Sequence, residues 1–369
     1  MNSRIKLLVL FGGASSEHEI SRVSAASVLE HIDTDKYTIY QVGITKKGKW
    51  FLTEATPKQI SDGSWEGLAT NKNAQIATDF SKTLMTWSDG EIISSCRHEI
   101  DVVFPVLHGR NGEDGTIQGL LQLAGIPFVG TGASASAACM DKAVTKAIID
   151  QAEVCQQARC SIVHRGFDEE EAAKAVDCFF EGEYPLFVKP ANSGSSVGIS
   201  KVKNVYELPQ ALHKAFEEDS KALVEEAIIG REIEVAVLGN RESSEGLKAS
   251  CIGEIFAANE FYDYNAKYDN KASRTAIVKD LPDRLEEDIR EKALKIYELM
   301  GCDGLSRVDF FLTPDENGDY SKGNAVFNEI NTIPGFTSIS MYPQLWEASG
   351  ISYSELIDRL IDLAFECRR

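Results

Sequence analysis

Apolar and polar residues alternate most regularly in two neighbouring runs near the carboxyl end of the chain. The first run, residues 305–312, has apolar side chains at alternate positions, which predicts a strand with one buried face. This alternation places Arg307 and Asp309 together on the opposite face. A segment rich in Gly, Pro, Asp and Asn follows, so we expect the chain to reverse direction after this strand. The side chains expected in the core are Val308, Phe310 and Leu312.

The second run, residues 324–331, alternates in the same way. Val326 and Ile330 are predicted to face the core, while Glu329 and Asn331 face the other side. An antiparallel hairpin of the two runs would bring one arginine, two carboxylates and one side-chain amide onto a single surface.

This polar surface has the composition of a metal and phosphate site. Asp309, Glu329 and Asn331 offer oxygen ligands, which suit Mg²⁺ held partly by protein and partly by phosphate. Arg307 could neutralise charge that develops on a transferring phosphoryl group. Residues 332–340 are rich in hydroxyls and small side chains, which can present donors to an anion. We interpret the stretch as a catalytic hairpin, although a solvated hairpin face can have the same composition.

The amino-terminal pattern predicts a strand over residues 5–11, a glycine turn and a helix over about 17–31. Ser16 and Glu19 have the spacing of a capping box, which predicts the helix start. A dinucleotide-binding oxidoreductase also begins this way, but the G-x-G-x-x-G series is absent. Glu17, at the carboxyl end of the strand, is placed to bind an ammonium group. The alternative is an ordinary first-turn glutamate that the helix dipole favours.

Two further strands run into glycine-rich loops. The strand 102–107 leads into the loop 108–115, whose composition indicates ligand contact. The strand 185–190 carries Lys189 near its end and leads into the Gly/Ser-rich stretch 191–202. Backbone amides of such a loop can cover a phosphate, although a plain flexible hairpin would look the same.

The remaining pattern predicts an α/β protein of mixed α+β type. Residues 53–100 show no informative periodicity, and a helix is expected to run from 139 to about 151. Residues 256–279 form an aromatic and charged stretch with the length of an active-site lid. Pro282 then begins an amphipathic helix that Gly301 ends.

Composition narrows the classes of function. A chain of 369 residues should hold two or three domains. Its net charge of −19 argues against nonspecific binding to nucleic acid or to an anionic membrane. Its apolar runs are too short for a membrane helix. The eight cysteines are scattered without C-x-x-C spacing, so we expect reduced thiols and a cytoplasmic protein.

Seven motifs in this order resemble the D-alanine–D-alanine ligase family. The resemblance implies an ATP-grasp fold of three domains: an N-terminal domain with a Rossmann-like parallel sheet (1–138), a central subdomain (139–230) and a C-terminal catalytic domain (231–369). ATP would bind between the last two domains. The motifs lie at residues 11–21, 107–115, 139–142, 187–198, 262–268, 307–309 and 328–343.

The resemblance also implies a role for each matching residue. ATP would be bound through its phosphates by Lys142, Lys189 and Lys267, and through adenine and ribose by Glu225, Glu232 and the hinge backbone of Ala227 and Ile228. Two Mg²⁺ ions, or Mn²⁺ in their place, would be bound by Asp309, Glu329 and Asn331. The amino acids would be bound and activated by Glu17, His108, Ser195, Tyr268, Arg307, Gly335, Ser340 and Met341. Within this set, Glu17 would hold the first ammonium group, and Arg307 with the amide of Gly335 would stabilise the tetrahedral centre.

The implied reaction is ATP-dependent joining of two D-alanine molecules through an acyl phosphate, for peptidoglycan precursor synthesis by a homodimer in the cytoplasm. Ligases that use D-serine or D-lactate as second substrate are the alternative within the family. A nucleotide and amino-acid sensor without catalysis is the alternative outside it. One position departs from the family pattern, because Glu226 stands where some members carry a lysine that contacts nucleotide.

Overall fold

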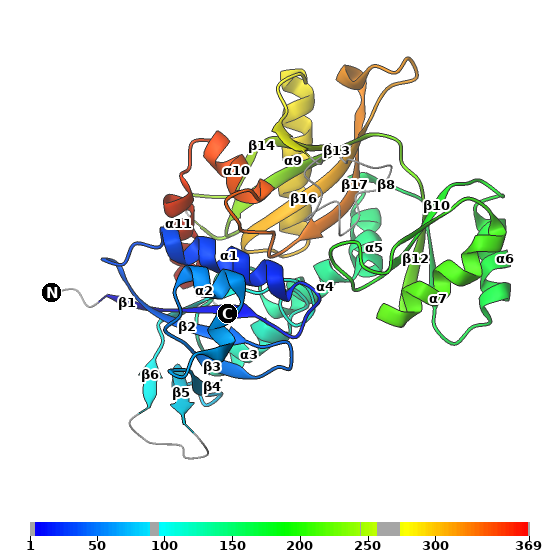
Figure 1. Ribbon diagram of the computed structural model, residues 1–369. Coiled ribbons are helices and arrows are strands. Elements are labelled where there is room, and N and C mark those ends of the chain that lie inside the picture. The colour runs from blue at the N-terminus through cyan, green and yellow to red at the C-terminus, as the bar shows by residue number, and fades with distance from the viewer. Residues whose placement is uncertain (1–3, 89–95, 244, 257–273, 368–369) are drawn as a thin grey trace.

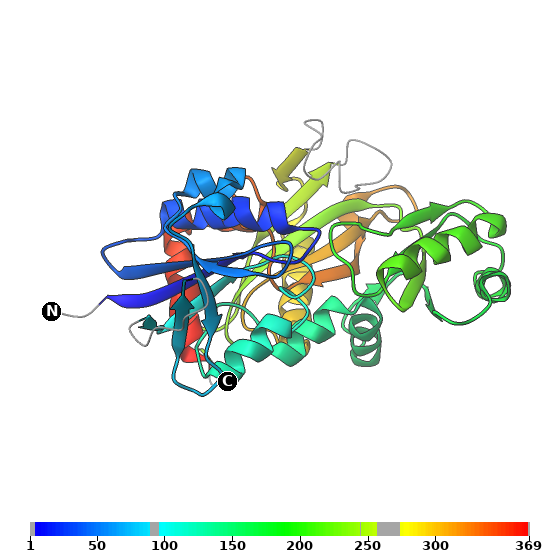
Figure 2. The same cartoon turned by 60° about the horizontal axis from the view of Figure 1, so that its bottom comes forward.

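A computed structural model describes residues 4–88, 96–243, 245–256 and 274–367. These residues form three sheets, of seven, four and six strands. Figure 1 shows the seven-stranded sheet at one end, the four-stranded sheet at the other and the six-stranded sheet between them, and the turned view of Figure 2 keeps this order. Among the described helices, none has both the length and the apolarity needed to cross a membrane.

The N-terminal sheet is only partly parallel. Its order is β6-β5-β4-β3-β2-β1-β7, in which β2, β1 and β7 run parallel and the strands from β3 to β6 pair antiparallel. The expected parallel sheet is therefore confined to three strands. The strands are β1 (Ile5–Gly12), β2 (Tyr37–Ile44), β3 (Trp50–Leu52), β4 (Lys72–Ile76), β5 (Thr83–Trp87), β6 (Arg97–Glu99) and β7 (Val102–Val106).

Strand β1 is buried on both faces, as its continuous apolar run predicts. One set of its alternating side chains packs in the core with α1 (His18–His31), and the other set packs with α3 (Thr116–Ala124). Because β1 and β7 are neighbours and run parallel, their carboxyl ends lie side by side. The loops that carry Glu17 and His108 begin at these two strand ends.

Residues 53–100 contain more structure than their pattern indicated. Besides β4, β5 and β6, they form the helix α2 (Pro57–Asp62) and a short 3₁₀ helix, η1 (Ser64–Gly67). The strands are only three to five residues long and half-buried, which is too short for a period to stand out.

The four-stranded sheet, β11-β10-β12-β9, has its own small core with two helices. The helices α6 (Glu169–Phe179) and α7 (Leu208–Glu218) pack against it and against each other. Its strands are β9 (Cys160–His164), β10 (Leu186–Pro190), β11 (Ser200–Val202) and β12 (Lys221–Glu226), and the 3₁₀ helix η2 (Val205–Glu207) precedes α7.

The six-stranded sheet, β15-β14-β13-β16-β17-β8, packs one face on α9 (Asp283–Leu299) and is joined to the N-terminal sheet through α10 (Met341–Ala348) and α11 (Tyr353–Glu366). The 3₁₀ helix η3 (Tyr320–Lys322) lies in the hairpin turn. The strands are β8 (Gln156–Gln157), β13 (Arg231–Gly239), β14 (Lys248–Phe256), β15 (Arg274–Ile277), β16 (Gly304–Thr313) and β17 (Asn324–Asn331).

The predicted hairpin is confirmed as β16 and β17, with Asp309 opposite Glu329 and Arg307 opposite Asn331. One detail was wrong. A register shift after Asp309 places Phe327, not Val326, beside Ile330 in the core. The bulge changes the alternation on the turn side of the hairpin only, so the four polar residues still share one face.

Two helix starts also differ from the prediction. The helix expected from residue 139 to 151 is broken at Asp141 into α4 (Ala133–Met140) and α5 (Lys142–Ala152), because the Asp141 side chain accepts from the amides of Ala143 and Val144 and begins a new helix. The capping box of Ser16 and Glu19 does not form. Instead α1 begins at His18, and the amide of Glu17 donates to Ser15 Oγ at 3.1 Å.

The fold makes a prediction about Tyr297, whose buried hydroxyl donates to the carbonyl oxygen of Gly239 at 2.7 Å. Tyr297→Phe leaves that carbonyl without this donor, so we expect the free energy of unfolding to fall by about 1–2 kcal/mol in denaturant titrations. The exposed Tyr206 serves as control, since Tyr206→Phe should leave stability unchanged. Equal stability of the two variants would contradict the assigned hydrogen bond.

Candidate active site

Two adjoining cavities lie on the polar face of the six-stranded sheet. The first lies between this sheet and the four-stranded sheet, and the second is lined also by residues of α1 and of the loop after β17. Ser195, Arg307 and Glu329 line both cavities. A group bound in one cavity can therefore meet a group bound in the other at these side chains.

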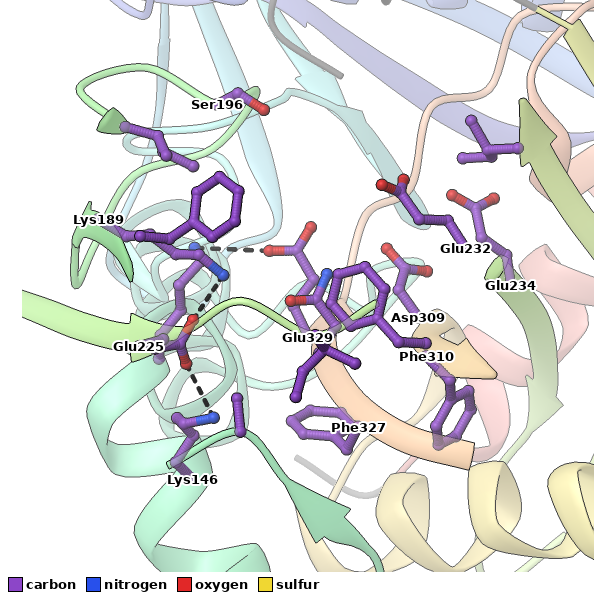
Figure 3. A pocket seen from close by; sticks show the side chains of 18 of the residues that line it. Lys146, Lys189, Ser196, Glu225, Glu232, Glu234, Asp309, Phe310, Phe327 and Glu329 are labelled. Atoms are coloured by element: carbon purple, nitrogen blue, oxygen red, sulfur yellow. Dashed lines mark ion pairs between the residues drawn. The ribbon is translucent and has the colours of Figure 1, made fainter. Parts of the chain in front are cut away.

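One wall of the first cavity carries a buried carboxylate between two lysines. Figure 3 shows Glu225 between Lys146 and Lys189. The Nζ atoms of the two lysines lie 2.8 and 2.6 Å from the carboxylate oxygens of Glu225. Burial by itself would raise the pKa of Glu225, but the two ammonium groups outweigh it and lower the pKa to about 2. The pair of lysines exceeds the carboxylate by one positive charge, which favours a bound anion.

This arrangement bears on two residues of the sequence prediction. Glu225 was expected to contact adenine or ribose, and in the structure both of its oxygens are engaged by lysines. Lys146 was not singled out. Its signal was present, however, because Lys146 follows Lys142 by four positions and so lies on the same face of α5.

Lys142, at the first position of α5, connects the glycine-rich loop to the hairpin. Its Nζ donates to the carbonyl oxygen of Ser193 at 2.7 Å and lies 3.6 Å from Glu329 Oε2. In the same loop Ser195 and Ser196 both adopt positive φ, at 48° and 60°, a backbone conformation that is strained for these residues. The loop is thus held in an unusual shape above the cavity.

The opposite wall is formed by carboxylates around Arg307. Its Nε and Nη2 donate to the two oxygens of Asp309, both at 2.7 Å, and Nε lies 3.1 Å from Glu234 Oε1. Asn331 Nδ2 donates to Asp309 Oδ2 at 3.0 Å. Burial would lower the pKa of Arg307, but these carboxylates raise it well above its ordinary value, so the guanidinium stays charged.

The charges of the first cavity fit divalent cations. Among the described residues its lining holds four cationic side chains, Lys142, Lys146, Lys189 and Arg307, and six carboxylates, Glu225, Glu226, Glu232, Glu234, Asp309 and Glu329. A polyphosphate would meet net negative charge here unless cations accompanied it. No three His, Cys, Asp or Glu side chains in the described part of the chain form a metal site alone, so an ion would also need the Asn331 oxygen and ligand oxygens.

Glu17 reaches the second cavity from the end of β1. Its side chain is 7% exposed. A Cβ atom added to Gly194 or Gly109 would lie only 2.5 or 3.0 Å from Glu17 Oε1, so both glycines let their backbones approach the carboxylate closely. This contact brings the loop after β1 and the glycine-rich loop together.

His108 lies between the N-terminal sheet and the loop after β17. Its Nδ1 is 3.1 Å from the carbonyl oxygen of Ile333, and its Nε2 is 3.0 Å from Ser24 Oγ. Although it lines the second cavity, the ring is 2% exposed and both nitrogens face protein atoms. Burial would lower its pKa, but the neighbouring carboxylate of Glu113 raises it.

The loop after β17 leads into α10 at the edge of the second cavity. Ser340 precedes the first residue of α10, Met341, and its Oγ accepts from the amide of Thr337 at 3.0 Å. A Cβ on Gly335 would lie 3.0 Å from Ser340 Oγ, so the turn is tight. Because the first amides of a helix lack partners within it, this end of α10 is suited to bind a carboxylate.

Other predicted residues are placed as follows. Ile228 and Glu232 line the first cavity, and the amide of Ala227 donates to the carbonyl oxygen of Pro185. Lys267 and Tyr268, in the expected lid, lie outside the described residues. Glu234 was missed, although it follows Glu232 by two positions on one face of β13.

The lysine pair around Glu225 makes a prediction about acid stability. Because the pKa of Glu225 is lower in the fold than its ordinary value near 4.5, its ionised form stabilises the fold at neutral pH, and this contribution is lost as the pH falls toward 2. We expect Lys146→Met to lower the free energy of unfolding by about 3 kcal/mol at pH 7 and to move acid unfolding to higher pH. Circular dichroism across pH would measure both.

The matched control is Lys174→Met, which changes an exposed lysine of α6. It should unfold like the parent protein at every pH. An acid-unfolding curve that is the same for both variants would show that Lys146 does not hold the charge of Glu225.

Known proteins resemble this chain over nearly its whole length. Family models described as D-ala D-ala ligase N-terminus and C-terminus match residues 6–131 and 148–362. The D-alanine–D-alanine ligase B of Clostridium tetani is 47% identical over 361 residues, which are 98% of this chain and 94% of that protein.

Solved structures resemble the chain as well. The VanG D-Ala:D-Ser ligase from Enterococcus faecalis superposes with a TM-score of 0.84 at 39% identity and covers 98% of this chain and 100% of its own. The D-alanine–D-alanine ligase from Bacillus anthracis, solved with ATP, has a TM-score of 0.70 at 28% identity over 99% of this chain and 98% of its own. The chain therefore belongs to the D-alanine–D-alanine ligase family and has the α/β architecture of the ATP-grasp enzymes.

Proposed function

We propose that this protein joins two D-alanine molecules at the expense of ATP to form D-alanyl-D-alanine, the dipeptide used in peptidoglycan precursors. One observation carries the proposal. Arg307 and Glu329 line both cavities, so the carboxylate of an amino acid in the second cavity can meet the terminal phosphate of ATP in the first. The ATP complex of the Bacillus anthracis relative supports ATP as the nucleotide.

In this proposal the first cavity binds ATP. Lys142 and Lys189 contact the phosphates of ATP. Lys146 forms an ion pair with Glu225 and balances its negative charge. Asp309, Glu329 and Asn331 would hold two Mg²⁺ ions, or Mn²⁺, which bound there would offset the charge of the phosphates. Glu232 and the hinge backbone near Ile228 lie where the nucleoside would extend.

Two steps then follow at the junction. Glu17 orients the first D-alanine through its ammonium group, and the substrate carboxylate attacks the terminal phosphorus, which releases ADP and leaves an acyl phosphate. The amine of the second D-alanine, once it has lost a proton, attacks the acyl carbon, and inorganic phosphate leaves. Arg307 and the amide of Gly335 would stabilise the oxyanion of this step, while the start of α10 binds the second carboxylate.

The remaining expectations are part of the same proposal. The domains 1–138, 139–230 and 231–369 would correspond to the three sheets, except that β8 (Gln156–Gln157), within 139–230, pairs with β17 of the six-stranded sheet. A cytoplasmic location is supported by eight cysteines that are all free thiols. A homodimer is proposed from the family resemblance, and the molecular mass in solution tests it.

A D-alanine–D-serine ligase is the second candidate, because a solved enzyme of that kind is 39% identical to this chain. Phosphate release from Mg-ATP with D-alanine alone, and with D-alanine plus D-serine, tests both, and mass spectrometry identifies the product. We expect D-alanyl-D-alanine as the main product. Absence of D-alanine-dependent phosphate release would rule out the proposed reaction, whereas a main product containing serine would favour the second candidate.

For Arg307 we predict a loss of turnover without a matching loss of nucleotide affinity. Arg307→Ala should lower kcat by roughly 100-fold or more, since it removes donors that act on the transition state. Titration calorimetry should show ATP affinity close to that of the parent. Arg284→Ala, at an exposed position of α9, is the control and should leave both quantities unchanged. Equal losses of kcat and ATP affinity would contradict the role.

For Glu17 the expected defect lies in amino-acid binding. Glu17→Gln removes the charge that meets the ammonium group, so the KM for the first D-alanine should rise by roughly 10-fold or more, with ATP affinity unaffected. Steady-state kinetics with varied D-alanine measures this. Glu19→Gln changes a partly exposed glutamate in the first turn of α1, two residues after Glu17, that pairs with Lys46, and it should behave like the parent. Weaker nucleotide binding in Glu17→Gln would argue against the assignment.

A further inference from the structure

Glu234 is a buried carboxylate to which neither the sequence pattern nor the family resemblance gave a role. It is 4% exposed and lines both cavities. It lies on β13 opposite Asp309 of β16, and its Oε1 is 3.1 Å from Nε of Arg307. Removing a carboxylate from water costs several kcal/mol, so an apolar residue here would be the simpler choice for stability.

The neighbouring contacts show what this carboxylate can do. Arg307 donates to both oxygens of Asp309, and Asp309 is also a candidate metal ligand. If an oxygen of Asp309 bound a divalent cation, the hydrogen bonds from Arg307 to Asp309 would weaken. The guanidinium would then lose its alignment at the junction unless a second carboxylate held it. Glu234 is a second carboxylate within ion-pair distance of Arg307.

The strand that carries Glu234 suits a positioning role. β13 is an inner strand of the six-stranded sheet, and the side chains on either side of Glu234, Ile233 and Val235, are buried in the core. Figure 3 shows the carboxylates of Glu234 and Asp309 close together on the same wall of the cavity. A charge fixed to a rigid strand keeps its place when the loops around the site move.

We propose that Glu234 is a positioning residue that holds Arg307 at the junction while Asp309 binds the metal. The inference rests on the proposed function, because it assigns Arg307 to the reacting group. According to this proposal, Glu234 acts through Arg307. A metal ion can then bind Asp309 while Glu234 keeps the arginine in place.

The test uses Glu234→Gln, which keeps the size of the side chain and removes its charge. We expect kcat to fall roughly 10-fold to 100-fold, as is usual for groups that orient a metal or its neighbours, with the KM for ATP little changed. A second readout needs no turnover. Mg²⁺ titrated onto the protein–ADP complex in a calorimeter should bind on the order of 10-fold more weakly, because Arg307 would then compete for Asp309.

Glu254→Gln is the matched control. Glu254 is also buried and also pairs with an arginine of β13, Arg231, at 2.6 Å, but it lines neither cavity. Its variant should lose stability without a change in kcat or in Mg²⁺ affinity. A purely structural role of Glu234 would give Glu234→Gln this same behaviour and would overturn the proposal.

A double-variant comparison tests whether Glu234 acts through Arg307. In an Arg307→Ala background, Glu234→Gln should lower kcat by less than twofold, since the group to be positioned is gone. An undiminished effect there would overturn the proposal. If Glu234→Gln does not fold, Glu234→Asp takes its place, because it keeps the negative charge but moves it one methylene away from Arg307. We expect a smaller loss of kcat and of Mg²⁺ affinity in this variant. A kcat and a Mg²⁺ affinity equal to those of the parent would overturn the proposal. If the parent released no phosphate with D-alanine, the proposed function would fail while the Mg²⁺ titration would still test Glu234.

Discussion

The site depends on one constraint, that each charge removed from water must meet an opposite charge. At one wall of the first cavity Glu225 is held by Lys146 and Lys189, and at the other wall Arg307 is held by Asp309 and Glu234. Burial favours the neutral form of each group, and the close partners reverse this preference. The charges that a phosphate or a carboxylate would meet are therefore present and oriented before any ligand arrives, which reduces the reorganisation needed during reaction.

Rigid apolar packing behind the site makes this matching possible. The strands β13, β16 and β17 place Val235, Val308 and Ile330 in the core, while their alternate side chains form the polar wall. The first cavity takes its other wall from a different sheet, and the second cavity takes Glu17 and His108 from the loops that follow β1 and β7 of the third sheet. Residues from or next to three sheets thus line two cavities that share Arg307.

Much of the site could be predicted because its parts are local. Strand alternation alone placed Arg307 and Asp309 on one face, and a lysine before a glycine-rich loop indicated a phosphate site at Lys189. Lys146 and Glu234 were missed because the spacing from Lys142 and Glu232 indicated only the face on which each lies, whereas their ion-pair partners, Glu225 and Arg307, are distant in sequence. The short strands between residues 53 and 100 were not predicted, because they are recognised by their pairing with neighbouring strands and not by an alternating apolar pattern.

The sequence by itself determined the polar face of the hairpin, the loops that follow the buried strands, the family and hence the ATP-grasp architecture. Each of these depends on residues close together in the chain or on motifs in a given order. Only the tertiary structure decided which charges neutralise which, where the bulge after Asp309 shifts the pairing, and that two cavities share Arg307 and Glu329. The physical reason is that electrostatic energy depends on distance and burial in space, which the order of residues does not specify until the sheets have packed.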